Sequence, residues 1–307
     1  MTQTHIAVVG AGLMGHGIAY LFGAAGHRVR VQDPSPAALE QLPLRLREIC
    51  DLLGTDRATA DQVEGSSSLA EAVADADFVF EAVPEKLELK QQLFAELERL
   101  APARAIFCSN TSSIPIASIG ARLADPSRLV GAHFWNPPHL VRLVEVVVKD
   151  EANRAAAERV VELLRAAGRH PVVLNRDIPG FVGNRLQHAL KREAIALVAA
   201  GVCDAETIDD VVKLGFGARL AVLGPLEQSD LVGLDLTKAI HDVLISDLDV
   251  TPHTHPYLDA LVAKGELGMK TGKGFRSWTP ETAAAVRERL RTFLAKSARA
   301  DGSESGR

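Results

Sequence analysis

A glycine-rich turn near the start of the chain constrains the fold more than any other segment. The run Gly10-Ala-Gly12-Leu-Met-Gly15 follows an apolar strand expected at residues 5–9 and opens a helix expected at residues 13–25. Gly10 suits a tight turn, Gly12 lets the backbone approach a pyrophosphate, and Gly15 lets the helix pack close to the strand. The positive end of the helix dipole then points at the bound anion. This arrangement predicts a dinucleotide-binding β-α-β unit.

An acidic residue follows the second strand of this unit. Asp33 comes directly after an apolar run at residues 28–32, where a carboxylate accepts hydrogen bonds from the adenine-ribose hydroxyls and repels a 2′-phosphate. NAD is therefore favoured over NADP. Two other interpretations are a glycine-rich turn without a ligand and an FAD site, although FAD folds usually need a larger second domain. The expected cofactor-binding residues are Gly10, Gly12, Leu13, Met14, Gly15 and Asp33.

Strands and helices alternate through the first part of the chain. Further strands are expected at residues 28–32, 77–82, 105–108 and 171–174, and helices at residues 37–53, 87–100 and 151–167. Strands separated by helices of this length favour a mainly parallel sheet, here with a hairpin at its edge. We therefore expect an α/β domain of the Rossmann type over residues 1–178.

The pattern changes near residues 176–181. Beyond them, helical periodicity predicts helices at residues 182–200, 204–214, 225–245 and 255–264, without strand alternation of comparable strength. Gly201 suits the end of the first of these helices, and Asp204 suits the N-cap of the next. We expect an all-helical domain over residues 179–307, with a disordered polar tail from about residue 299.

His133 and Glu145 lie in two apolar runs that flank a turn-rich segment. The runs cover residues 128–134 and 140–148, and both residues are equally distant along the chain from His139 in the turn. An antiparallel hairpin therefore places their side chains opposite each other. A carboxylate in that position fixes the imidazole tautomer and stabilises the imidazolium, as a general base requires. The alternative is a core histidine and a surface glutamate on an edge strand.

The composition restricts the environment and the partners of the chain. A net charge of −5 and a charged fraction of 24% are ordinary for a globular protein and give no indication of nucleic-acid or anionic-membrane binding. No apolar stretch reaches membrane-spanning length, and the N-terminal residues lack a signal-peptide pattern. Three scattered cysteines fit reduced thiols, so we expect a cytoplasmic protein. No metal is assigned, since His253 and His255 lack carboxylate or cysteine partners beside them.

Six motifs occur in an order that resembles one family. They are Gly10-Ala-Gly-Leu-Met-Gly-His-Gly-Ile-Ala, Glu81-Ala-Val-Pro-Glu85-Lys-Leu-Glu-Leu-Lys90, Ser109-Asn-Thr-Ser112-Ser, His133-Phe-Trp-Asn136-Pro, Leu143-Val-Glu145-Val and Pro179-Gly-Phe-Val-Gly-Asn184-Arg. Together they resemble the L-3-hydroxyacyl-CoA dehydrogenase family over nearly the whole chain. The resemblance implies NAD-dependent oxidation of the 3-hydroxyl group of an L-3-hydroxyacyl-CoA or a free 3-hydroxy acid. It also implies a homodimer formed through the helical domain.

The resemblance assigns roles to the matching residues. His133 is expected to be the general base and Glu145 the residue that orients it. Ser112 is expected to hydrogen-bond the reacting oxygen, and Asn136 and Asn184 to help position substrate and nicotinamide. Glu85 and Lys90 are expected to border the nicotinamide-ribose site. Without the other motifs, Ser112 reads equally as a residue that caps a turn, and Asn184 as a residue in the first turns of a helix.

The sequence leaves open whether the substrate is a CoA thioester or a free acid. The 51 residues between Asp33 and Glu85 are fewer than in CoA-specific relatives, and Arg45, Arg47 and Arg57 stand where those relatives carry a lysine-rich arm. Members that act on free acids, such as L-gulonate and carnitine dehydrogenases or a dehydrogenase of vitamin B6 degradation, resemble the segment at residues 136–139 more closely. In such a member Arg142 or Arg219 can bind a substrate carboxylate.

Two other functions compete with this hypothesis. A β-hydroxyacid dehydrogenase of the 6-phosphogluconate type uses a lysine on the interdomain helix, where Lys191 lies, but the glycine-to-lysine spacing of that family is missing. A non-catalytic NAD-binding protein, such as a redox sensor or a lens crystallin, predicts damage to the catalytic set. That set is intact here.

Overall fold

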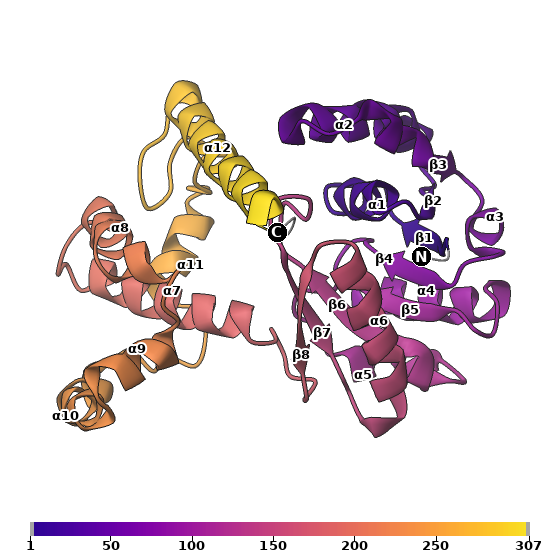
Figure 1. Cartoon of the computed structure of the whole chain (residues 1–307). Coiled ribbons are helices and arrows are strands. Elements are labelled where there is room, and N and C mark those ends of the chain that lie inside the picture. Colours follow the sequence, from indigo (N-terminus) through magenta and orange to yellow (C-terminus); the bar gives the residue numbers. More distant parts are fainter. Residues whose placement is uncertain (1–2, 305–307) are drawn as a thin grey trace. The chain divides into compact units, whose positions relative to one another are not determined.

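The computed structural model describes the backbone of residues 3–304 and the side chains through residue 299 (Figure 1). The chain forms two compact units. The first contains the residues up to Asn184 and those from Leu290 on, and the second contains Arg185–Arg289. The sequence analysis placed residues 179–307 in one helical domain, whereas in the structure the residues from Leu290 on belong to the first unit.

The first unit is built on a sheet of eight strands in the order β3-β2-β1-β4-β5-β6-β7-β8. The strands are β1 (His5–Val9), β2 (Arg28–Gln32), β3 (Val63–Ser66), β4 (Phe78–Glu81), β5 (Ile106–Ser109), β6 (Leu129–Phe134), β7 (Leu143–Val147) and β8 (His170–Leu174). Neighbouring strands are parallel except β6 and β7, which form the expected antiparallel hairpin. β8 pairs in parallel with β7, so β8 rather than the hairpin forms the edge of the sheet.

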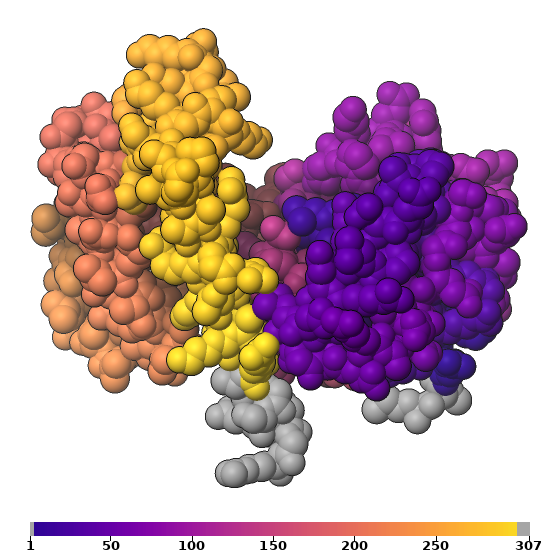
Figure 2. Space-filling model, turned by 90° about the horizontal axis from the view of Figure 1, so that it is seen from above, coloured from indigo at the N-terminus to yellow at the C-terminus, as the bar shows by residue number. Residues whose placement is uncertain are grey.

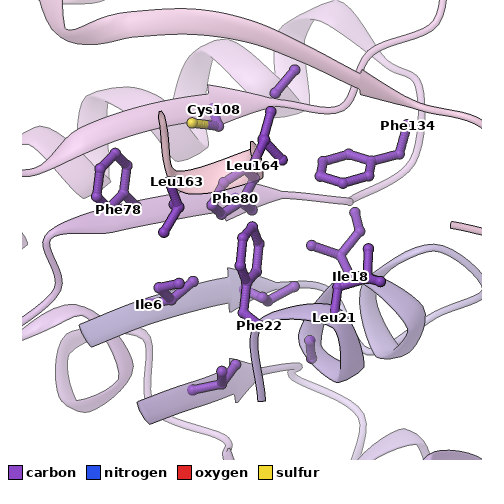
Figure 3. Packing of buried hydrophobic residues seen from close by; sticks show 14 of the residues in the cluster. Ile6, Ile18, Leu21, Phe22, Phe78, Phe80, Cys108, Phe134, Leu163 and Leu164 are labelled. Carbon is purple, nitrogen blue, oxygen red and sulfur yellow. The ribbon is translucent and has the colours of Figure 1, made fainter. Parts of the chain in front are cut away.

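Helices cover both faces of this sheet (Figure 1). One hydrophobic cluster joins the sheet to α1 (Gly15–Ala24), α2 (Pro36–Leu53) and α6 (Arg154–Ala166). A second joins the opposite face to α3 (Leu69–Val73), α4 (Leu87–Leu100) and α5 (Ile116–Ile119). In the first cluster Phe22 of α1 packs on Phe80 of β4 with ring centroids 4.7 Å apart, and Phe80 meets Phe134 at the end of β6 (Figure 3).

Short elements of the first unit, among them β3, α3 and α5, were not expected from the sequence. β3 has only four residues, of which Val63 alone is a strong strand former, and α3 has five residues capped by Ser68. Both fall below the length at which hydrophobic periodicity separates a strand or helix from a loop. β3 extends the sheet beyond β2, on the side away from β5 and β6.

The second unit is helical. It contains α7 (Gly183–Ala199) from Arg185 on, α8 (Ala205–Leu214), α9 (Pro225–Val232), α10 (Leu234–Leu244) and α11 (Pro256–Ala263). Asp204 caps α8 by accepting a hydrogen bond from the Thr207 amide, as the sequence predicts. The single helix expected at residues 225–245 is wrong, because Gly233 has φ +99° and separates α9 from α10. A right-handed helix cannot pass through that backbone conformation.

The final helix, α12 (Pro280–Glu304), was missed by the sequence analysis. Its residues divide between the two units. Within the first unit, the Arg299 guanidinium donates to the Leu52 carbonyl at the end of α2. The space-filling view draws α12 in yellow and α2 in purple (Figure 2). The tail expected to be disordered from about residue 299 is therefore helical through Glu304, since the helix formers before Gly302 extend α12. The rest of that tail lies outside the described residues. No helix in the described part of the chain is both long and apolar enough to cross a bilayer.

Candidate active site

The glycine-rich turn leaves an open space at the carboxyl end of β1. A Cβ on Gly15 would lie 1.7 Å from the Gly10 carbonyl oxygen, and a Cβ on Gly10 would lie 2.7 Å from the Ala82 carbonyl oxygen. These two glycines are required by close backbone packing. A Cβ on Gly12, in contrast, would meet nothing within 4 Å. The exposed Gly12 therefore borders open space, which a pyrophosphate at the first turn of α1 would require.

Asp33 joins the end of β2 to the glycine-rich turn. Its Oδ2 accepts a hydrogen bond from the Ala11 amide at 2.8 Å, and its Oδ1 accepts one from the Ser35 amide at 2.9 Å. Each carboxylate oxygen has a second lone pair, so the group is held in place and still accepts hydrogen bonds from ribose hydroxyls. Leu13 is exposed and Met14 half-buried beside it. The residues expected to hold NAD thus lie together at one edge of the sheet, and they fit it.

His133 and Glu145 form a buried pair across the hairpin. They are register partners on β6 and β7, and His133 Nδ1 lies 2.8 Å from Glu145 Oε2. Their exposed fractions are 4% and 1%. With Nδ1 engaged by the carboxylate, Nε2 is the nitrogen left for proton exchange with a ligand. The hairpin spacing therefore predicts the contact correctly.

Glu145 is held by a tight turn at the start of α7. Its Oε1 accepts hydrogen bonds from the Val182 and Gly183 amides, both at 3.0 Å. Burial raises the pKa of Glu145, but the hydrogen bonds from His133 and from these amides outweigh it and hold the pKa below its ordinary value. The carboxylate therefore stays ionised beside the imidazole at neutral pH.

The turn that supplies these amides has a strained backbone. Phe181 has φ 52° although it is not a glycine, and its side chain is fully buried, with its ring centroid 5.6 Å from that of His133. A Cβ on Gly183 would lie 2.3 Å from the ring of Trp135, whose centroid is 5.4 Å from that of His133. The positive φ of Phe181 and the absence of a side chain at Gly183 thus let the rings of Phe181 and Trp135 pack beside the imidazole.

Ser112 lies on a loop that follows β5 and is held from two sides. Glu85 Oε1 accepts hydrogen bonds from the Thr111 hydroxyl at 2.6 Å and from the Ser112 amide at 2.9 Å. On the other side, the Asn184 side-chain amide donates to the Ser112 carbonyl at 3.0 Å. The Ser112 side chain itself is exposed and available to a ligand.

The structure brings four of the expected site residues together and places the others in different surroundings. His133, Glu145, Ser112 and Asn184 belong to one network at the carboxyl ends of β5 and β6, because Asn110 Oδ1 also accepts the Phe134 amide at 2.8 Å. Asn136 lies exposed in the turn beyond Trp135. Lys90 is only 1% exposed and is held by Glu81 and Glu85 at 2.7 and 3.2 Å. Arg142 is half-buried at the start of β7, and Arg219 is exposed in the second unit.

Several residues of this network were not singled out from the sequence. Glu81, Ser109, Asn110, Thr111 and Phe181 have interior or loop positions whose roles depend on contacts distant in the chain. The sequence did offer one indication of this network. Glu81 and Lys90 are charged residues inside segments whose other residues are typical of a core, and such residues are rarely buried unless they are paired.

Comparison with known proteins identifies relatives of the whole chain. Residues 5–178 match the family model described as 3-hydroxyacyl-CoA dehydrogenase, NAD binding domain, and residues 180–278 match the C-terminal domain of 3-hydroxyacyl-CoA dehydrogenase. The 5-formyl-3-hydroxy-2-methylpyridine 4-carboxylate 5-dehydrogenase of Mesorhizobium japonicum is 35% identical over 95% of this chain and 96% of the relative. The mitochondrial hydroxyacyl-coenzyme A dehydrogenase of Homo sapiens is 37% identical over 88% of this chain and 90% of its own.

Other relatives extend this range. The L-carnitine dehydrogenase of Streptomyces griseus is 40% identical over 74% of this chain and 69% of its own. A solved structure of a 5-formyl-3-hydroxy-2-methylpyridine 4-carboxylic acid 5-dehydrogenase, an NAD⁺-dependent dismutase, superposes with a TM-score of 0.90 at 32% identity and covers 98% of this chain and 99% of that one. A (S)-3-hydroxybutyryl-CoA dehydrogenase from Ralstonia eutropha superposes with a TM-score of 0.76 at 30% identity, covering 91% of this chain and all of that one.

Proposed function

The chain belongs to the 3-hydroxyacyl-CoA dehydrogenase family, and from that premise we propose that it oxidises the hydroxyl group of a free carboxylic acid rather than of a CoA thioester. Its reaction class is NAD-dependent oxidoreduction at CH–OH groups. The proposal concerns the substrate handle and the roles of the individual side chains.

The observation that carries the proposal is that two of the three arginines standing in for a CoA-binding arm are engaged within the protein, while the third, Arg47, is exposed. Arg57 donates to both oxygens of Asp51 at 2.8 Å, and Arg45 donates to the Ala11 carbonyl at 3.1 Å. A Cβ on Gly23 of α1 would lie 3.3 Å from the Thr59 carbonyl oxygen, so the segment after α2 packs back on α1. This segment therefore supports the sheet and offers little charge to CoA phosphates.

A pair of guanidinium groups beside the hairpin turn supports an acidic substrate. Burial, followed by the neighbouring charge of Arg142, lowers the pKa of Arg169 to about 10. Arg169 itself donates only to the Ala167 and Pro138 carbonyls, at 3.4 Å each, among the described residues. An anionic ligand beside these two guanidinium groups would be attracted by both positive charges. The near end-to-end match to a pyridine-carboxylate dehydrogenase supports the same substrate class.

The proposed mechanism follows from the network around His133. His133 Nε2 takes the proton of the substrate hydroxyl, and Glu145 stabilises the resulting imidazolium through Nδ1. The Ser112 hydroxyl donates a hydrogen bond to the reacting oxygen, and Asn136 and Asn184 orient the substrate. Gly10, Gly12, Leu13, Met14, Gly15 and Asp33 would hold NAD, with Glu85 at the nicotinamide ribose. The bound dinucleotide supplies the hydride acceptor.

A substrate panel tests this function. NADH oxidation is measured with acetoacetyl-CoA, with free 3-oxo acids and dehydro-sugar acids, and with formyl-pyridine carboxylates. We expect kcat/KM for one of the free acids to exceed that for acetoacetyl-CoA by at least about 100-fold, roughly what one bidentate carboxylate contact contributes. A higher value for acetoacetyl-CoA would support the second candidate, an L-3-hydroxyacyl-CoA dehydrogenase, which the human relative favours.

We also propose a homodimer formed through the helical unit. None of the residues of α8, α9 and α10 is buried, and Leu214, Leu226 and Val243 are 81%, 80% and 79% exposed. Monomeric proteins rarely expose apolar surface of this extent. Light scattering after size exclusion should give twice the mass of 32.8 kDa, and a monomer at micromolar concentration would contradict the dimer.

A reducing compartment such as the cytoplasm is proposed from the free thiols of Cys50, Cys108 and Cys203.

A further inference from the structure

Two side chains donate hydrogen bonds to consecutive carbonyl groups of the glycine-rich turn. Arg45 of α2 reaches the Ala11 carbonyl oxygen with one guanidinium nitrogen at 3.1 Å. The imidazole of His16, in the first turn of α1, lies with Nδ1 at 2.7 Å from the Gly12 carbonyl oxygen. The donors belong to different helices, but their acceptors are neighbours in the chain. The carbonyl side of the turn is therefore held by two side chains.

These contacts also set the direction of the amides in the same two peptide groups. Both groups are trans, since the cis bond found within residues 3–304 precedes Pro137, and a trans peptide points its C=O and N–H bonds to opposite sides. The Gly12 amide therefore points away from Arg45, and the Leu13 amide points away from His16. Within residues 3–304 neither amide has a protein acceptor, and both residues are exposed.

The two held peptide groups are the ones that flank Gly12. Glycine has more backbone freedom than any other residue, so without support both groups can turn. Successive amides that point into one open space bind an anion, and the positive end of the α1 dipole adds to the attraction. Amides that are oriented before the ligand arrives bind it more tightly, because their ordering then no longer opposes binding.

His16 acts in this turn as a neutral donor. A carbonyl oxygen only accepts, so the proton of the imidazole lies on Nδ1. Burial lowers the pKa of His16, and the charge of Arg45 lowers it further, against the hydrogen bond to Gly12 and the charge of Glu48. At about pH 8 the imidazole is therefore uncharged. Its contribution at this pH is a hydrogen bond within the turn and not a charge beside the ligand.

We propose that Arg45 and His16 form a carbonyl clamp, a pair of positioning residues that directs the Gly12 and Leu13 amides at the diphosphate of the dinucleotide. The clamp acts through the backbone of the turn and needs no contact with the dinucleotide. The inference rests on the proposed position of NAD at the Gly10–Gly15 turn. It gives half-buried Arg45 a role that its exposed neighbour Arg47 does not share.

The expected consequence is a loss of affinity that is specific to the diphosphate. The NAD⁺ dissociation constant should rise about tenfold in Arg45→Met and in His16→Leu, the upper range for one lost hydrogen bond. ADP should lose as much affinity as NAD⁺. Adenosine, which has the ribose hydroxyls but no phosphate, should bind both variants within about twofold of wild type. At saturating NAD⁺, kcat should also stay within about twofold, because the residues around His133 are unchanged.

The test measures binding to the full-length protein at about pH 8. Calorimetry gives the dissociation constants of NAD⁺ and ADP, and displacement of fluorescent NADH gives that of adenosine. Arg45→Lys and His16→Asn are the conservative variants, since Lys keeps a donor on a long stem and the Asn amide replaces the imidazole Nδ1. Both should recover most of the lost affinity. Arg47→Met, on the same helix, is the matched control and should bind NAD⁺ like wild type.

Salt separates positioning from a direct ion pair between Arg45 and the diphosphate. An exposed ion pair is screened by salt, whereas a hydrogen bond inside the turn is not removed by it. The ratio of the Arg45→Met and wild-type dissociation constants should therefore change by less than about twofold between about 0.05 and 0.5 M NaCl. A ratio that falls toward one at high salt would make Arg45 a ligand of the diphosphate and would overturn the clamp.

Other outcomes also decide the inference. Equal losses for adenosine and ADP, or NAD⁺ affinity unchanged in both Arg45→Met and His16→Leu, would overturn it. Wild-type protein that binds ADP no more tightly than adenosine would contradict the proposed position of the diphosphate and the clamp with it. A substrate panel without an active free acid would contradict the proposed substrate class alone, since these affinities are measured without substrate.

Discussion

Glu145 meets His133 across the hairpin at 2.8 Å with one carboxylate oxygen, and it uses the other to accept two backbone amides from the turn before α7. The carboxylate therefore cannot rotate away from the imidazole without breaking its hydrogen bonds to two backbone amides. This arrangement fixes which nitrogen of His133 is protonated in the resting enzyme and keeps the other ready to accept a proton.

Replacement of His133 by Ala should remove the proton acceptor and leave the cofactor site intact. We expect kcat to fall by about 10²- to 10⁴-fold, which is what a positioned base contributes. The NAD⁺ dissociation constant, measured by calorimetry, should stay within about twofold because the glycine-rich turn is unchanged. His170→Ala, at an exposed position on β8, is the control. Turnover near wild type in the His133 variant would exclude it as the base.

Glu145→Gln should reverse the tautomer of His133. The Gln oxygen must face the Val182 and Gly183 amides, so its NH₂ group faces Nδ1 and donates to it. The proton then resides on Nε2, and the base is blocked. We expect kcat to fall by roughly 10²- to 10⁴-fold although the fold is kept. If kcat is unchanged and NMR still shows Nδ1 protonated, the tautomer argument is wrong.

The sequence predicts this pair because the two residues are close along the chain and their contact depends only on hairpin register. The Gly10–Gly15 turn was accessible for the same reason, since a Cβ on Gly15 would meet the Gly10 carbonyl only five residues earlier in the chain. Glu81 with Ser109 was not accessible, because their pairing depends on the order of β4 and β5 in the sheet. The break at Gly233 was missed because a single glycine inside a helical pattern does not show whether the helix ends there. The helix α12 was missed because its polar residues favour a helix individually but show no apolar periodicity.

Ser112→Ala should lower turnover by about 10- to 100-fold through the loss of one hydrogen bond to the reacting oxygen. The side chain is exposed and its backbone contacts to Glu85 and Asn184 remain, so the melting temperature should be unaffected. Ser67→Ala, on an exposed serine far along the chain, provides the control. The steady-state kcat and KM decide the matter: a rise in KM alone would indicate that Ser112 binds substrate without favouring the transition state.

The glycines of the cofactor turn should separate into two classes. Gly12→Ala adds a methyl group to open space, so the melting temperature should be unchanged while the NAD⁺ dissociation constant rises at least about tenfold. Gly15→Ala forces a methyl group against the Gly10 carbonyl and should lower the melting temperature by roughly 5–10 °C. Thermal unfolding and calorimetry on the two variants measure both effects. An equal loss of NAD⁺ affinity at equal stability would contradict the division.

His139 should make the protein less stable in mild acid. Burial, and then the charges of His16 and Arg169, lower the pKa of His139 to about 4 from its ordinary 6.5. Between these two pKa values the unfolded chain binds a proton that the folded chain does not, so the stability is fully present above 6.5 and falls as the pH decreases toward 4.

The free energy of unfolding, measured with denaturant, should decrease between pH 7 and pH 5. This decrease should be smaller in His139→Gln than in wild type by roughly 1–2 kcal/mol. His170→Gln should lose as much as wild type, because His170 is exposed at the start of β8. If His139→Gln loses as much stability as wild type over this interval, His139 is protonated in the folded protein and its burial does not set its charge.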